Sequence, residues 1–107
     1  MKKELIYLLV FVLSFSFVSA GVVINEIMYN PLGVSDTYGE WFELYNKGID
    51  EVDIDGWTLK DDGVNNYVIN NDGYLGIPSK GFITLCRNSN ISINGGINCD
   101  YDYGAFY

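Results

Sequence analysis

Residues 52–59 read Val-Asp-Ile-Asp-Gly-Trp-Thr-Leu, and this stretch decides the fold class because apolar and polar side chains alternate on both sides of a glycine. Side chains on a β-strand point to opposite faces in turn, so Ile54 is expected to enter the core. Trp57 shares a face with Leu59, and we expect Trp57 in the core for that reason. Gly56 interrupts the alternation, which predicts a bulge or a bend between two sheets.

Short runs of the same kind occur on both sides of this stretch. Clusters of Gly, Asn, Asp and Pro separate them, and no long segment has helical periodicity. The expected strands cover residues 22–29, 41–46, 66–69, 82–86 and, at the end of the chain, 101–107. Short strands separated by turn signals predict an all-β sandwich or barrel.

Length and composition limit what this protein can do. The chain has 107 residues, which is room for one small domain, with a net charge of −8 and no His. The absence of His excludes a Ser-His-Asp triad, a Cys-His dyad and an HExxH zinc site. The excess of acidic residues argues against nucleic-acid binding, which depends on clustered Lys and Arg. We therefore expect a protein that is not an enzyme and does not bind nucleic acid.

Residues 1–20 have the three parts of a secretory signal peptide: a short basic start, an apolar middle and a small-residue end. The expected cleavage lies between Ala20 and Gly21. It would leave a domain over residues 21–107, secreted or at the cell surface and without a stable membrane span. The alternative is an uncleaved N-terminal membrane anchor, because residues 5–24 are twenty residues without a charge.

The expected export changes the charge and the interpretation of the two cysteines. Residues 2–4 together carry +1, so residues 21–107 carry a net charge of −9. In an oxidising compartment two Cys in one small domain usually pair, which makes Cys86 and Cys99 a candidate disulfide. Two separate buried thiols, or a thiol partner elsewhere, are the alternatives. Two Cys without His do not make a zinc site.

Four segments, in order, resemble motifs of the lamin-tail domain family. They are residues 23–31, 39–46 and 52–61, and residues 77–78 together with 81–85. The resemblance covers about residues 22–86 and implies an immunoglobulin-like β-sandwich with no shared catalytic residue. The prokaryotic relatives that it implies are typically exported, often beside secreted nucleases, hydrolases or adhesion modules.

The C-terminal end departs from that family. Lamin-tail domains usually continue past an aromatic segment like residues 101–107 into a polar turn and two further strands. We therefore expect a C-terminally truncated domain that lacks its last strands, with a naturally trimmed domain as the alternative. A sandwich without those strands would expose a long sheet edge, which favours aggregation.

An acidic cluster around the central stretch matches a calcium-loop spacing. Glu51, Asp53 and Asp55 precede Gly56, and Asp62 follows six residues later. Calcium requires several oxygen atoms that converge on one point, which this spacing can supply. The flanking segments are expected strands, however, and there the same acids would only line a solvated face. We favour the solvated face and expect no cofactor, with calcium as the sole candidate.

Other acids and aromatic residues suggest further sites. A pair of carboxylates, Glu40 with Glu43 or Glu26 with Glu43, is what glycoside hydrolysis requires, but nothing in the sequence marks a pocket around them. Trp41, Glu43 and Tyr45 share one face of their expected strand and form a candidate binding surface for a protein or a surface glycan. Residues 90–92, Asn-Ile-Ser, are an N-glycosylation sequon centred on Asn90.

These observations favour an exported, non-catalytic module that mediates protein association or adhesion at the cell surface. One alternative is an accessory domain of a larger secreted hydrolase or nuclease whose catalytic part lies beyond Tyr107. Another is a calcium-dependent surface module. The sequence pattern does not indicate an oligomeric state.

Overall fold

The computed structural model describes residues 21–105, and over these residues the chain is nearly all β-structure. The elements are β2 (Val22–Met28), α1 (Asp36–Gly39), β3 (Trp41–Asn46), β4 (Val52–Asp53), β5 (Thr58–Lys60), β6 (Asn66–Val68), β7 (Gly76–Ile77), β8 (Phe82–Cys86) and β9 (Tyr101–Asp102). The expected signal peptide, residues 1–20, lies outside the described residues. Ala20, on the N-terminal side of the expected cleavage site, therefore lies outside them too. Within the described part, no helix has the length and apolar character needed to cross a membrane.

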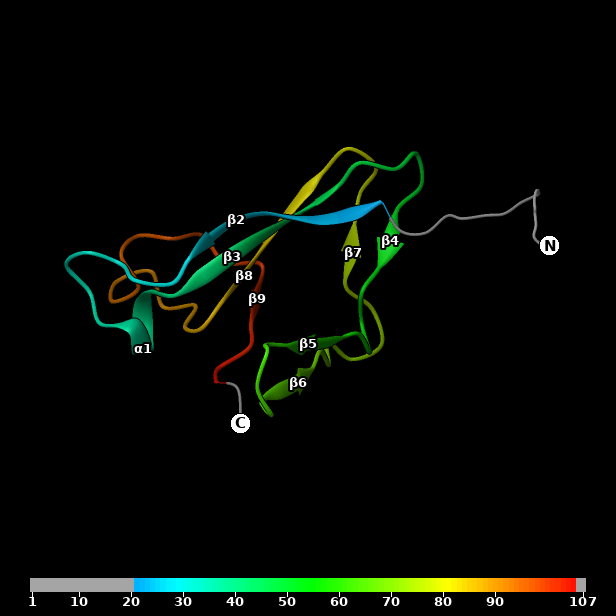
Figure 1. The fold of residues 1–107 in the computed structure, drawn as a ribbon. Coiled ribbons are helices and arrows are strands. Elements are labelled where there is room, and N and C mark those ends of the chain that lie inside the picture. Colours follow the sequence, from blue (N-terminus) through cyan, green and yellow to red (C-terminus); the bar gives the residue numbers. More distant parts are fainter. Residues whose placement is uncertain (1–20, 106–107) are drawn as a thin grey trace.

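The strands form two layers, which confirms the expected immunoglobulin-like sandwich. One layer is a four-stranded sheet in the order β2-β3-β8-β9 (Figure 1). β3 pairs antiparallel with both β2 and β8, while β9 joins β8 in parallel. The second layer consists of two antiparallel pairs, β4 with β7 and β5 with β6.

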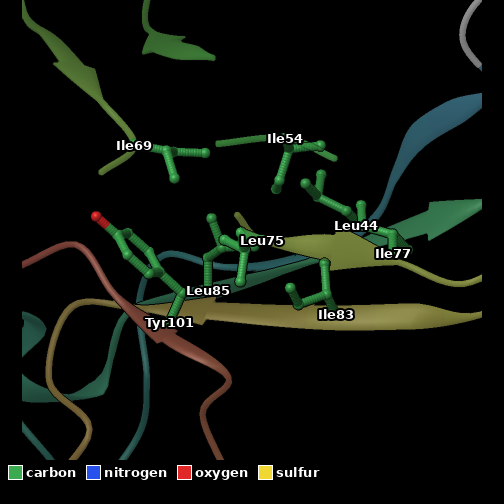
Figure 2. Close-up of a cluster of buried hydrophobic side chains, with 8 residues drawn as sticks. All are labelled: Leu44, Ile54, Ile69, Leu75, Ile77, Ile83, Leu85 and Tyr101. Carbon is green, nitrogen blue, oxygen red and sulfur yellow. The ribbon is translucent and has the colours of Figure 1, made fainter. Parts of the chain in front are cut away.

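The hydrophobic core lies between the layers and takes four side chains from each. The four-stranded sheet supplies Leu44, Ile83, Leu85 and Tyr101, and the second layer supplies Ile54, Ile69, Leu75 and Ile77. Figure 2 shows Ile54 and Ile69 on one side of this core, facing side chains of the four-stranded sheet on the other. Ile54 is fully buried, which confirms the prediction made from its place in the alternating stretch.

Gly56 produces the predicted bulge. The Trp57 N–H donates to the Ile54 carbonyl at 3.0 Å, which closes a turn of four residues, 54–57. Gly56 is the third residue of this turn and has a φ of 84°, a conformation that favours glycine. Gly56 donates its N–H to the Ile69 carbonyl at 2.8 Å, and Ile69 donates its own N–H to the Trp57 carbonyl at 2.8 Å. Two residues thus lie opposite one, and the chain turns from β4 into β5.

The prediction of a buried Trp57 is wrong, because its side chain is 41% exposed. Trp57 and Leu59 both border a groove between β5 and the neighbouring sheet. The alternation therefore gave the correct face, but the opposite layer does not fill the space in front of it. Which face a side chain takes depends on local geometry, whereas burial depends on the distant segment opposite.

The last strand is shorter than expected. Only Tyr101–Asp102 form β9, although the Tyr103 N–H still donates to the Cys86 carbonyl at 2.9 Å. Tyr101 is nevertheless a core residue, since its parallel pairing with Leu85 directs the ring between the layers. Its hydroxyl reaches the second layer, where it accepts a hydrogen bond from the Asn70 N–H at 3.0 Å.

A buried amide joins β3 to the second layer. Asn46 is fully buried, and its Nδ2 donates to the Asp50 carbonyl at 2.8 Å and to the Ile77 carbonyl at 2.9 Å. Its Oδ1 accepts the Gly48 N–H at 2.9 Å. Since a buried polar group is costly without partners, these bonds explain an amide at a position where a strand would otherwise bury an apolar residue.

Candidate binding face

The three residues predicted to form a binding surface lie along one face of β3. Trp41, Glu43 and Tyr45 alternate with Phe42 and Leu44, and Leu44 points into the core. Trp41, Glu43 and Tyr45 therefore occupy the opposite, solvent-facing side of the four-stranded sheet, which we call the outer face. All three are half-buried within the sheet rather than fully exposed.

Neighbouring strands extend the outer face on both sides. Phe82 lies opposite Tyr45, and the centroids of their rings are 4.6 Å apart. Phe82 is also 53% exposed. On the other side Met28 lies opposite Trp41, and Glu26 lies opposite Glu43. The outer face thus has an aromatic pair at one end, an indole at the other and two carboxylates between them.

The carboxylates are arranged for a surface rather than for catalysis. Glu26 and Glu43 do lie opposite each other in register, but on an open sheet face. Glu43 accepts a hydrogen bond from the Asn25 side-chain amide at 2.8 Å. Glu40 forms an ion pair with Arg87 at 3.2 Å instead of joining Glu43. A glycoside hydrolase holds its substrate between its two carboxylates, whereas Glu26 and Glu43 lie on the outer face and Glu40 borders a groove without either of them.

The candidate calcium ligands do not converge. Asp53 Oδ1 accepts the N–H groups of Asp55 and Leu75, both at 2.9 Å. Asp55 Oδ1 accepts the Asn71 N–H at 2.5 Å. Within residues 21–105, which contain all four candidate acids, no group of three or more His, Cys, Asp or Glu side chains could hold a metal ion. The Asp-x-Asp spacing instead serves the turn at Gly56, because each carboxylate accepts backbone N–H groups that this turn and the next loop leave unpaired.

A disulfide joins Cys86 to Cys99, whose Cα atoms are 5.9 Å apart. It closes the loop that links β8 to β9. Buried Asn94 orders that loop, since its Nδ2 donates to the carbonyls of Asn88 and Ile97 at 2.9 and 3.0 Å. The sequon residue Asn90 is exposed on the same loop, and its side-chain oxygen accepts the Ser92 N–H at 3.0 Å.

The family follows from a comparison with known protein families. A family model described as Lamin Tail Domain matches residues 16–103. The chain belongs to the lamin tail domain family. This match extends on both sides of the four motifs that carry the resemblance in the sequence. Comparison of this lamin tail domain with curated proteins and with solved structures gave no match.

A groove on the inner face is the feature that the sequence did not predict. It has a volume of about 660 Å³ and runs between β5 and the side of the four-stranded sheet formed by β2 and β3. Ile24 and Ile27 border it and are 60% and 57% exposed. They are three residues apart, yet both lie on the inner face, because a bulge between Ile24 and Glu26 shifts the register. This bulge could have been predicted from the sequence, because two isoleucines that share a face of a regular strand would be separated by an even number of residues, not by three.

Three tyrosines pack together at the edge of the core: Tyr101 belongs to the core, and Tyr67 and Tyr103 pack against it. The hydroxyls of Tyr67 and Tyr101 hydrogen-bond each other at 2.6 Å. Burial, followed by the hydrogen bond to Tyr101, raises the pKa of Tyr67 from 10.0 to about 12. Burial is also the main cause that raises the pKa of Tyr103 to about 12. The raised pKa values favour the neutral forms of Tyr67 and Tyr103, whose rings pack against the core of this lamin tail domain.

Proposed function

We propose that this lamin tail domain is an exported, non-catalytic module that mediates protein association or adhesion at the cell surface. The observation that carries the proposal is the outer face, where Trp41, Glu43 and Tyr45 line one strand beside exposed Phe82. Aromatic side chains with a polar edge are typical of contact surfaces, because they offer a large area at low cost in conformational entropy.

Export is supported by two independent features. Residues 1–20 have the pattern of a signal peptide, and the Cys86–Cys99 bond suits an oxidising compartment. The non-catalytic role is supported by the absence of His from the chain and by the position of the paired glutamates on an open surface. A protein or a surface glycan is the partner class that an acidic, aromatic face can bind.

Adhesion can be tested on intact cells of the producing organism. Beads that carry the purified protein should bind these cells, and the Tyr45→Ala/Phe82→Ala double variant should bind them at least about tenfold less, as expected when an aromatic pair central to a contact is removed. The matched control is Ile49→Ala, because Ile49 is 84% exposed and belongs to no strand. Equal binding by the double variant would contradict a role for the outer face.

Export is tested separately by the mass of the protein recovered from the cell surface or the medium. A mature chain that begins at Gly21 is the expected result. Recovery of the chain with Met1 intact from the cytosol would contradict export and leave the adhesion experiment to be judged alone.

A further inference from the structure

We propose that the loop between β8 and β9, residues 87–100, contains a spontaneous modification site, Asn94, which deamidates when this loop opens. The reaction needs no enzyme and no reactant other than water. While the loop is closed, the fold prevents the reaction, and after the reaction the loop can no longer close. The proposal is independent of the proposed function, because no surface of the sandwich takes part in it.

The sequence of this loop contains a reactive pair, because Asn94 is followed by Gly95 and then by Gly96. No other Asn in the chain precedes a glycine. The backbone requires both glycines, since Gly95 has a φ of 90° and Gly96 a φ of 86°, a conformation that other residues rarely adopt. A glycine has no Cβ, so it also leaves its own backbone nitrogen unshielded. The turn thus places the least hindered nitrogen next to the amide that it can attack.

The reaction is an exchange of one amide for another, followed by hydrolysis. The Gly95 nitrogen attacks Cγ of Asn94, so a new N–Cγ bond forms and the Cγ–Nδ2 bond breaks. Nδ2 leaves as ammonia, with the proton that the Gly95 nitrogen gives up. The cyclic succinimide that results takes up one water at either of its carbonyls, which leaves an aspartate or an isoaspartate at position 94. Either product has a carboxylate in place of the neutral amide, and such losses make Asn a thermolabile residue type.

The closed loop opposes this attack because it holds the whole amide group of Asn94. Nδ2 donates to the carbonyls of Asn88 and Ile97 at 2.9 and 3.0 Å, and Oδ1 accepts the N–H groups of Gly96 and Ile97 at 3.0 and 2.9 Å. These four bonds use both N–H donors and both lone pairs of the amide. Asn94 is also only 2% exposed, so water has little access to it. Departure of Nδ2 would break both bonds that it donates, and we therefore expect the reaction to proceed from the open loop.

The disulfide controls how often the loop opens, and the product prevents it from closing. The Cys86–Cys99 bond joins the two ends of this loop, so its loss increases the population of the open form, which sets the rate of a reaction that needs opening. After deamidation, the carbonyls of Asn88 and Ile97 have lost their donor, because a carboxylate has no N–H. A charged group would also have to be buried where the neutral amide was. Deamidation of Asn94 thus makes a transient opening permanent.

The experiment incubates the unmodified protein at mildly alkaline pH in three states: oxidised and folded, treated with a reductant, and unfolded in urea. Peptide mapping by mass spectrometry measures how much Asn94 has become aspartate or isoaspartate, and water labelled with heavy oxygen marks the hydrolysis. We expect Asn94 to react fastest of all Asn residues in urea, at least about tenfold more slowly when oxidised and folded, and faster again with reductant. Equal rates in the folded and unfolded protein, or no reaction at Asn94 in urea, would overturn the proposal. A reductant without effect would overturn the part assigned to the disulfide.

A pair of variants tests whether the modified loop can close. Asn94→Asp reproduces one product, and should lower the melting temperature and speed hydrogen exchange of the N–H groups in residues 87–100. Asn98→Asp is the matched control, because it makes the same change at an exposed side chain of the same loop, and should alter neither. Equal melting temperatures and exchange rates of the two variants would overturn the claim that deamidation keeps the loop open. The rate comparison uses the unmodified protein, so it decides the proposal even where Asn94→Asp does not fold.

Discussion

The sandwich has a closed half and an open half, and the same residue type behaves differently in each. In the closed half, between β8 and the second layer, Ile54 and Ile77 are fully buried. In the open half, along β2, Ile24 and Ile27 are more than half exposed. All four point toward the space between the layers, Ile24 and Ile27 because the bulge at Asn25 shifts the register. Burial is therefore decided by whether a second layer lies opposite, and four experiments can break or sharpen this contrast.

The largest effect is expected in the closed half. Ile54→Ala leaves a cavity in a core that has no other way to fill it, and should lower the free energy of unfolding by about 2–5 kcal/mol. Thermal melting or urea unfolding measures the loss. A decrease below about 1 kcal/mol would mean that the core around Ile54 relaxes freely and that the closed half is not closed.

The disulfide should come next. Cys86 ends β8 and Cys99 precedes β9, so the bond holds the strand that brings Tyr101 into the core. Replacing both cysteines by Ser should cost about 3 kcal/mol for a loop of this length in the chain-entropy model. The same shift should appear when the unmodified protein is melted with a reductant. An unchanged melting temperature in both experiments would show that β9 stays in place without the bond.

High pH should weaken the contact between the two layers at the hydrogen bond of Tyr67 with Tyr101. The pKa of Tyr67 is about 12 in the folded protein, above the ordinary 10.0, so the unfolded chain loses this proton first. The stabilisation is therefore complete below pH 10 and is lost as the pH rises from 10 to 12. Melting temperatures across that interval should fall, and less steeply for Tyr67→Phe than for the unmodified protein. Equal slopes would show that the Tyr67 hydroxyl has no part in this pH dependence.

The smallest effect is expected in the open half. Ile27→Ala removes a side chain that is 57% exposed, and should change the free energy of unfolding by about 0.5 kcal/mol or less. Ile54→Ala measured side by side is the matched comparison, because the chemical change is identical. A loss comparable to that of Ile54→Ala would mean that β2 is covered in solution and that the groove is filled.

The strands and their faces were largely predictable from the sequence. The alternating stretch at residues 52–59 placed Ile54 in the core and Gly56 at a bulge or bend, and the run at residues 41–46 placed Trp41, Glu43 and Tyr45 on one face of one strand. Such inferences succeed because side-chain direction and glycine conformation depend on neighbouring residues alone. Of the outer face, only the three residues on β3 were predictable. Their neighbours Phe82 and Glu26 come from other strands, and the sequence does not state how those strands pair with β3.

The sequence did not predict which side chains are buried, nor whether the acidic side chains around Gly56 converge on one point. Trp57 shares a face with Leu59 as expected, but borders a groove instead of the core. The acids around Gly56 match a calcium spacing, but Asp53 and Asp55 bind backbone N–H groups of a turn and a loop. The buried Trp57 was a wrong prediction and calcium only the less favoured alternative, and in both cases a spacing along the chain does not state which segment lies opposite.

By itself the sequence determined the family, the all-β class, the absence of histidine chemistry and the acidic character of this lamin tail domain. Only the tertiary structure decided that β9 joins β8 in parallel, that Ile24 and Ile27 of β2 border a groove, and which apolar residues form the core. The physical reason is that alternation and turn chemistry act over a few residues, whereas burial depends on which distant segments pack together and where the second layer ends.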